Sequence, residues 1–150
     1  MLDRAGIATR IPHQGSMCLL DSAVAWDDAH IHCRAASHAA QDNPLRADGR
    51  LGAATGIEYA AQAMALHGAL LASPDGAARQ GYLASVRKLQ LHTTRLDDLP
   101  GQIDIRAERL SGDSGTILYQ FRLEHAGRTL LEGRAVVVMD ADRPSLEHSA

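Results

Sequence analysis

The sequence predicts an α+β fold in which a curved antiparallel sheet of five or six strands wraps around one long central helix. Residues 57–71 are apolar on nearly every side of a helix, which is typical of a buried helix. Two segments before this helix and four after it are β-compatible, several with clear alternation of apolar and polar residues, and turn-forming sequences separate most of them. One sheet of this size has enough area to curl around a single helix.

The expected helix carries one acid, Glu58, and Gln62 lies one turn later on the same face. Thr55 and Glu58 have the spacing of a capping box, in which both side chains satisfy backbone N–H groups at the helix start. A carboxylate walled by Ala, Leu and Met is also a candidate general acid or base. Both interpretations of Glu58 stay open.

The remaining elements follow in order along one domain, expected over residues 1–140, with a loose polar tail at 141–150. Residues 2–10 are a short helical or irregular lead-in. Residues 37–52 have little periodicity, and a loop of this length is usually functional or mobile. The expected strands are residues 17–26, 30–36, 82–93, 102–110, 116–124 and 129–139.

Composition disfavours several classes of function. The net charge of −3 is spread over the 150 residues with no basic stripe, so nucleic-acid binding and a polybasic membrane surface are disfavoured. The start of the chain has no apolar run of the secretory type, and a cytoplasmic location is expected. Cys18 and Cys33 are expected as reduced thiols in strands. His30 and His32 would share one strand face, but no third ligand is evident, so no metal and no other cofactor are expected.

Four short motifs lie at or near the ends of these expected elements. They are Ile11-Pro12-His13 followed by Leu19-Leu20-Asp21, the helix start Ile57-Glu58-Tyr59-Ala60-Ala61-Gln62, the strand segment Val86-Arg87-Lys88, and the turn Leu99-Pro100-Gly101. In this order, over roughly residues 10–140, they resemble the hotdog fold and, within it, the 3-hydroxyacyl-acyl-carrier-protein dehydratases of fatty-acid synthesis. The segments around Asn43 and Glu58 are also similar to dehydratase-like proteins of aryl polyene clusters.

The resemblance implies a dimer in which a helix acid of one subunit meets a loop histidine of the other. The histidine would remove the α-proton of a 3-hydroxyacyl thioester while the acid handles the departing hydroxyl. The ligand would be an acyl chain on the phosphopantetheine arm of an acyl carrier protein. Glu58 matches the acid, but the histidine position holds Asn43, which cannot accept a proton at neutral pH.

Three functions remain open after this departure. The chain is a dehydratase that uses another base, with His13 and His38 as candidates, or a thioesterase that uses the helix carboxylate alone. Alternatively, it is a non-catalytic acyl-carrier binding subunit that pairs with a complete dehydratase. Asn43, Gly56 and Gln62 are the expected substrate-binding residues, although Gly56 also suits close packing. Both a homodimer and a heterodimer with a related hotdog subunit are compatible with the sequence.

Two weaker features complete the prediction. His67 lies nine residues after Glu58, about 180° around the helix, and is therefore expected as a core or interface histidine. Several basic residues either meet an acidic carrier protein or are simply solvated. They are Arg46, Arg50, Arg87, Lys88 and Arg95.

Overall fold

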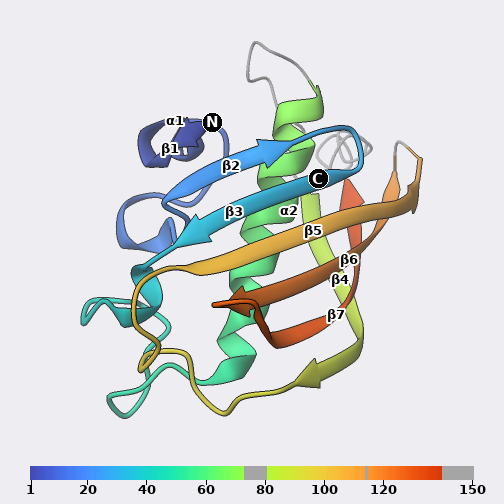
Figure 1. Ribbon diagram of the computed structural model, residues 1–150. Helices are drawn as coiled ribbons and strands as arrows, with labels where there is room; N and C mark the ends of the chain where they lie inside the picture. Colours follow the sequence, from blue (N-terminus) through green and yellow to red (C-terminus); the bar gives the residue numbers. More distant parts are fainter. Residues whose placement is uncertain (73–80, 114, 140–150) are drawn as a thin grey trace, which may run out of the picture.

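The computed structural model describes residues 1–72, 81–113 and 115–139. It has one antiparallel sheet in the order β1-β2-β3-β5-β6-β7-β4, which curves around helix α2 (Figure 1). The strands are β1 (Leu2–Asp3), β2 (Ser22–Trp26), β3 (His30–Ala35), β4 (Gly81–Leu91), β5 (Ile103–Gly112), β6 (Thr116–His125) and β7 (Arg128–Met139). The helices are α1 (Arg4–Ala8) and α2 (Gly56–Ala72), with 3-10 turns η1 (Gly15–Met17), η2 (Ser37–Ala39) and η3 (Ala53–Thr55).

The predicted central helix, the two strands before it and the four strands after it are confirmed. The sheet has seven strands rather than five or six, because β1 adds a pairing of Leu2 and Asp3 with β2. Two residues are too few to show an alternating pattern. The first predicted strand starts late, at Ser22, because the preceding apolar residues form a buried loop. Cys18 lies in that loop and not in a strand, whereas Cys33 lies in β3.

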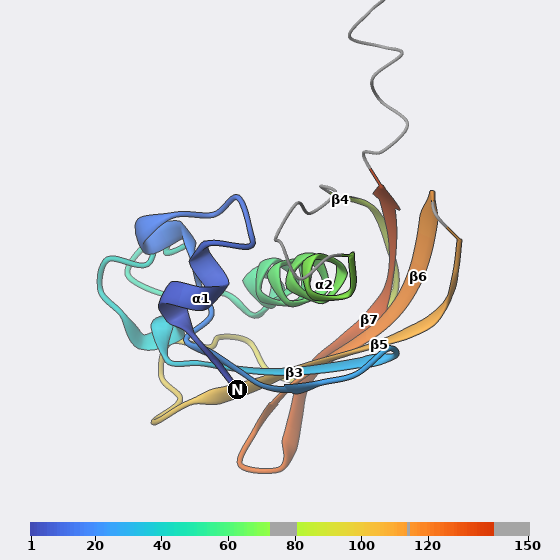
Figure 2. The same cartoon turned by 90° about the horizontal axis from the view of Figure 1, so that it is seen from above.

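Helix α2 lies in the concave face of the sheet, between the α1 segment and β4 (Figure 2). Its small residues allow this close approach: a Cβ on Gly56 would come within 2.7 Å of the Leu131 side chain. Apolar side chains from both layers form one core. They include Tyr59, Ala60, Ala63 and Leu66 of α2 and Ile31, Ile103, Ile105, Tyr119, Phe121, Leu123 and Leu131 of the sheet.

The helix is not buried on all sides. Ile57, Glu58, Ala61 and Ala65 form a half-buried stripe along one face, at spacings of three and four residues. The sequence could not reveal this stripe, because its alanines are as apolar as those in the core. The sheet covers the opposite side of α2, so this stripe is free to line a cavity.

Residues 37–52 form an ordered loop rather than an open one. The Arg46 guanidinium donates hydrogen bonds to the carbonyls of Ala39, Ala40 and Gly49. The Asp97 carboxylate accepts from the Leu51 N–H at 2.9 Å and also pairs with Arg95, and these bonds hold its pKa well below the usual range. The loop therefore has a fixed shape that its lack of periodicity does not predict.

Strand β4 is one edge of the sheet and is exposed along most of its length. Tyr82, Leu83, Leu89 and Leu91 leave between 38% and 47% of their surface accessible. Its pairing with β7 shifts twice, and Lys88 has a positive φ of 54° in the second shift. A long edge with exposed apolar side chains is the part of this sheet that suits contact with another chain. None of the described helices is long and apolar enough to cross a membrane.

Candidate active site

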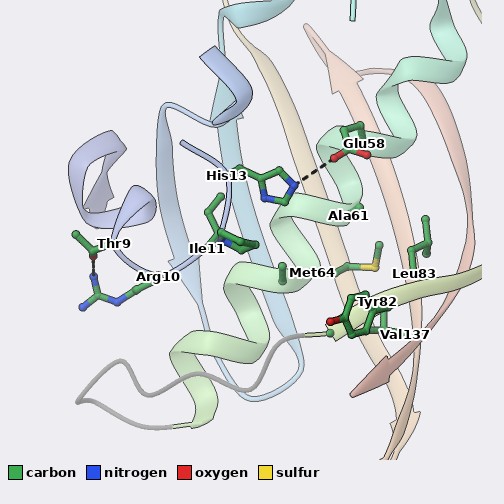
Figure 3. Close-up of a pocket in the computed structure, with 13 residues that line it drawn as sticks. Thr9, Arg10, Ile11, His13, Glu58, Ala61, Met64, Tyr82, Leu83 and Val137 are labelled. Atoms are coloured by element: carbon green, nitrogen blue, oxygen red, sulfur yellow. Dashed lines mark hydrogen bonds and ion pairs between the residues drawn. The ribbon is translucent and has the colours of Figure 1, made fainter. Parts of the chain in front are cut away.

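A pocket of about 500 Å³ lies between residues 9–13, helix α2 and the start of β4 (Figure 3). Its ionisable groups Arg10, His13 and Glu58 come from the N-terminal segment and from the first turn of α2, and β4 adds the Tyr82 phenol. Its apolar wall comes from later turns of α2 and from β4 and β7. The lining residues are Thr9, Arg10, Ile11, Pro12, His13, Glu58, Ala61, Met64, Ala65, Gly81, Tyr82, Leu83 and Val137.

His13 and Glu58 face each other in this pocket. The His13 Nε2 atom lies 3.4 Å from the Glu58 Oε1 atom, and their side chains are 27% and 39% exposed. Glu58 is therefore half-buried and in contact with the cavity, rather than enclosed in the core as its apolar neighbours suggest. An imidazole and a carboxylate at this distance can exchange a proton with each other or with a bound molecule.

The other ring nitrogen of His13 does not reach the cavity. Nδ1 is buried and has no hydrogen-bond partner within the described part of the chain. A proton on Nδ1 would be a buried donor without an acceptor, which is unfavourable. In the neutral imidazole the proton therefore lies on Nε2, the atom that faces Glu58. Nε2 can accept a proton only in the tautomer that carries the proton on Nδ1.

The segment that carries His13 is fixed on both sides. The Ile11 N–H donates to the Ile7 carbonyl at 3.2 Å, and the Ile11 side chain is buried. The Gln14 amide donates to the Ala8 carbonyl at 2.7 Å. Pro12 restricts the backbone between these two anchors. His13 thus projects from a short, constrained segment toward the first turn of α2.

Gln62 belongs to the support of this region rather than to the pocket lining. Its side-chain oxygen accepts from the Leu19 N–H at 2.9 Å, and its nitrogen donates to the Met17 carbonyl at 2.7 Å. The side chain is fully buried. The residue predicted to bind substrate therefore uses both polar atoms to fasten the N-terminal loop to α2.

His38, the second candidate base, is buried away from the pocket lining. Its Nε2 atom donates to the Leu99 carbonyl at 2.9 Å, and burial lowers its pKa. Nδ1 is buried without a partner among the described residues. The structure thus brings only His13, of the two candidate bases, into contact with Glu58.

Asn43 is 6% exposed and its amide is occupied inside the loop. Nδ2 donates to the Ser37 carbonyl and to the Tyr59 hydroxyl, and Oδ1 accepts from the Leu45 N–H. The Tyr59 hydroxyl in turn lies 2.8 Å from the Ser37 hydroxyl, and burial raises the pKa of Tyr59. Asn43 therefore joins the loop to α2 and does not line the pocket.

Of the two interpretations of Glu58, the capping box does not form at the helix start. The Thr55 hydroxyl donates to the Gly52 carbonyl at 2.6 Å, within the 3-10 turn that leads into the helix. The Glu58 carboxylate contacts His13. Gly56 packs against Leu131 and is absent from the pocket lining, so close packing accounts for it.

His67 is the buried core histidine that its position predicts. Nε2 donates to the Asp27 carbonyl at 2.8 Å, and Nδ1 accepts from the Tyr119 hydroxyl at 2.7 Å. Burial lowers the pKa of His67 and raises that of Tyr119 to about 12, so the imidazole is neutral and the phenol keeps its proton. This pair fastens the end of α2 to the sheet.

The thiol and imidazole groups offer no cation site in the described regions. Burial raises the pKa of Cys33 to about 12, which keeps it as an inert thiol. His32 contacts Asp104, and His30 contacts Asp27 and Glu108. No group of three or more His, Cys, Asp or Glu side chains suited to a metal occurs among the residues described.

The apolar wall of the pocket was not predicted from sequence. Met64, Leu83 and Val137 come from three elements that are far apart along the chain. One signal was present: Ala61 and Ala65 follow Glu58 at three and seven residues, on the same helix face. Small side chains beside a polar one leave room for a ligand, but in a helix rich in alanine they do not stand out.

Comparison with solved structures defines the class of fold. The chain is similar to the dehydratase heterocomplex ApeI:P from Xenorhabdus doucetiae, with a TM-score of 0.82 and 21% identity over 95% of this chain and 96% of that chain. It is also similar to a mutant of the hypothetical protein SAV0944 from Staphylococcus aureus, with a TM-score of 0.60 and 14% identity over 79% and 91% of the two chains. For thioesterase HI1161 from Haemophilus influenzae the TM-score is 0.58 and the identity 11%, over 79% and 76%.

These similarities, together with a sheet curved around one helix, define a hotdog protein. Comparison with curated proteins gives no match. The model of the ApeP-like family, described as ApeP dehydratase, matches residues 5–147, and the chain belongs to this family.

Proposed function

We propose that this chain acts on 3-hydroxyacyl thioesters carried by an acyl carrier protein, as a dehydratase in fatty-acid or polyene synthesis. The observation that carries the proposal is the contact between His13 and Glu58 beside a pocket with an apolar wall. Elimination of water needs a base at the α-carbon and an acid at the β-hydroxyl, on neighbouring carbons. Membership of a family described as dehydratases supports the same reaction.

In the proposed reaction, His13 takes the tautomer with its own proton on Nδ1, and the free Nε2 atom accepts the α-proton of the substrate. The electron pair of the broken C–H bond forms the double bond between Cα and Cβ, and the bond from Cβ to the hydroxyl oxygen breaks. Glu58, in its protonated form, gives its proton to that oxygen, and water leaves. Each proton transfer of this kind contributes about 10²- to 10⁴-fold to the rate.

The apolar wall is suited to the acyl chain. Ala61 and Ala65 lie about one and two turns beyond Glu58, on the same side of α2, and Met64 offers a flexible surface between them. Leu83 and Val137 form the facing wall from the sheet. An acyl chain with its β-carbon at Glu58 would extend along α2, away from the polar end.

The exposed edge strand β4 supports a second proposal about assembly. Its start lines the pocket through Tyr82 and Leu83, and the same residues are exposed at the sheet edge. A related hotdog subunit paired along β4 would cover apolar surface and border the pocket. The similar structure from Xenorhabdus doucetiae is a heterocomplex, which makes a heterodimer as reasonable as a homodimer for this chain.

The test is turnover of a 3-hydroxyacyl group loaded on an acyl carrier protein, with enoyl product and free thiol followed together. The wild-type chain and Glu58→Gln are compared, each alone and with an ApeI-type hotdog subunit. Enoyl product that falls about 100-fold or more in Glu58→Gln supports the dehydratase. A wild-type chain that yields no enoyl product under either condition contradicts it.

Thioester hydrolysis is the second candidate, because Glu58 is a single helix carboxylate at a cavity and the fold is shared with thioesterases. Free thiol that appears without enoyl product identifies it in the same assay. A loaded carrier that binds and yields neither product identifies a non-catalytic binding subunit.

A further inference from the structure

Three of the four residues in the half-buried stripe of α2 line the pocket. They are Glu58, Ala61 and Ala65, at spacings that keep them on one side of the helix. Both alanines are half-buried, whereas Ala60 and Ala63 are fully buried in the core. The methyl groups of Ala61 and Ala65 therefore face the cavity rather than the sheet, and they leave room beside Glu58.

The same side of α2 continues past the cavity. Gly68 and Ala72 occupy its next positions, but neither lines the pocket. Along α2 the described cavity therefore reaches no farther than the turn after Ala65. In Figure 3, Tyr82 lies at the end opposite Glu58, and Met64 lies between the two. The start of β4 thus borders the far end of the cavity.

The positions on the helix convert into a chain length. An α-helix rises about 1.5 Å per residue, so Ala61 lies about 4.5 Å and Ala65 about 10 Å beyond Glu58 along the axis. A carbon chain with C–C bonds of about 1.5 Å at nearly tetrahedral angles advances about 1.25 Å per carbon when extended. With its β-carbon at Glu58, an acyl group of about ten to twelve carbons would end beside Ala65.

We propose that the half-buried stripe sets the length of the acyl chain that this protein accepts, with Ala65 as the residue that admits the end of the chain. The inference rests on the proposed function, in which the ligand is an acyl thioester, and adds the chain length. Each methylene that reaches the apolar wall contributes about fourfold to affinity until the cavity ends. A larger side chain on the stripe would block the cavity at a known distance from Glu58.

The experiment compares Ala61→Leu and Ala65→Leu in the full chain, with and without an ApeI-type hotdog subunit. The control is Ala72→Leu, the same substitution on the same side of α2, at an exposed position outside the pocket lining. Urea unfolding checks that each variant folds. The added side chains at 61 and 65 enter the cavity rather than the core, and valine variants replace any leucine variant that does not fold.

The ligands are carrier proteins loaded with saturated acyl groups of four, eight, twelve or sixteen carbons. An amide joins each acyl group to the phosphopantetheine arm, so neither dehydration nor hydrolysis takes place, and the affinity is measured by calorimetry. The 3-hydroxyacyl thioesters of the same lengths are assayed for turnover in parallel. Binding therefore tests the length limit independently of the chemistry.

The inference predicts that wild-type affinity rises up to twelve carbons and changes less than about threefold from twelve to sixteen. Ala65→Leu should bind the four- and eight-carbon groups as wild type does and lose about 10-fold or more in affinity for the longer ones. Ala61→Leu should lose the eight-carbon group as well and keep only the shortest. Ala72→Leu should stay within about threefold of wild type at every length.

Three results would overturn the inference. An equal loss at every chain length in the pocket variants would mean a general disturbance of the site. An unchanged length profile in both variants would place the acyl chain elsewhere, and a shorter limit in Ala72→Leu would remove Ala65 as the end of the groove. The predicted length limits in binding, with no turnover of any 3-hydroxyacyl group, would support the inference while removing the proposed dehydratase function.

Discussion

Two loop segments, residues 37–52 and 9–13, each carry one candidate base and differ in what their polar groups contact. In residues 37–52, His38 and Asn43 are buried and bonded to the chain itself. In residues 9–13, the backbone is anchored, but the His13 imidazole points into a pocket toward Glu58. The first segment uses its polar side chains for stability, whereas the second holds one polar side chain available for a ligand.

The number of free hydrogen-bonding positions on a side chain separates a functional residue from a structural one in these two segments. A buried amide with all its groups paired gains nothing from a ligand, because it would have to give up bonds of equal strength. A half-exposed imidazole and carboxylate at a cavity have both access to the substrate and spare bonding capacity. Substitutions in the two segments should therefore affect different properties.

The largest effect is expected from the pair at the pocket. His13→Gln and Glu58→Gln should each lower kcat/KM about 10²- to 10⁴-fold, with little change in the free energy of unfolding. The double variant should lose no more than the worse single variant, because the two groups act as a unit. Steady-state kinetics and urea unfolding of the three variants test this. Losses that multiply in the double variant would mean that the residues act independently.

The next largest effect is a loss of stability in Asn43→His, a variant that places a histidine at the position suggested by family resemblance. The change breaks the bonds to Ser37, Tyr59 and Leu45 and should lower the free energy of unfolding by about 2–4 kcal/mol. Turnover per folded molecule should not rise, because this position does not line the pocket. A gain in turnover would reverse the assignment of the two segments.

A smaller loss of folding stability is expected from His38→Leu. The change leaves the Leu99 carbonyl without its donor, at a cost of about 1–2 kcal/mol. The cost stays at the low end because the substitution also removes the buried, unpartnered Nδ1 atom. Thermal unfolding should report the loss, while kcat/KM of the folded protein stays within about threefold. A 100-fold drop in kcat/KM would make His38 the base in place of His13.

The smallest expected effect is a change with pH in the stability that Asp97 gives to the loop of residues 37–52. Its folded pKa is lowered first by the hydrogen bond from Arg95 and then by the Leu51 N–H. The stabilisation is therefore present above the ordinary Asp pKa of about 3.9 and is lost as the pH falls below it. Urea unfolding should show wild type more stable than Asp97→Asn at pH 7, with a smaller difference at pH 3. Asp98→Asn, with a longer contact of 3.8 Å to Arg95, is the control. A difference that does not narrow at low pH would contradict this source of stability.

The sequence was sufficient for the order of elements. Alternation in β5 and β6 and the apolar character of α2 reflect burial, which is a local property of each residue. The turn between β6 and β7 was also visible in the sequence at residues 125–127. In the structure Ala126 and Gly127 both have positive φ in a two-residue hairpin loop. Strand β1 was missed because two residues carry no period.

The sequence determined that Glu58 is the acid of interest and that His13 is one of two candidate partners, since an acid in an apolar helix is recognisable by composition alone. Only the tertiary structure decided which histidine contacts Glu58, namely His13 and not His38, and it placed Asn43, Gly56 and Gln62 outside the lining of that pocket. The physical reason is that a side chain's function depends on which of its polar atoms remain unbonded. That depends on contacts such as those of Gln62 with Met17 and Leu19, across 45 and 43 residues of the chain.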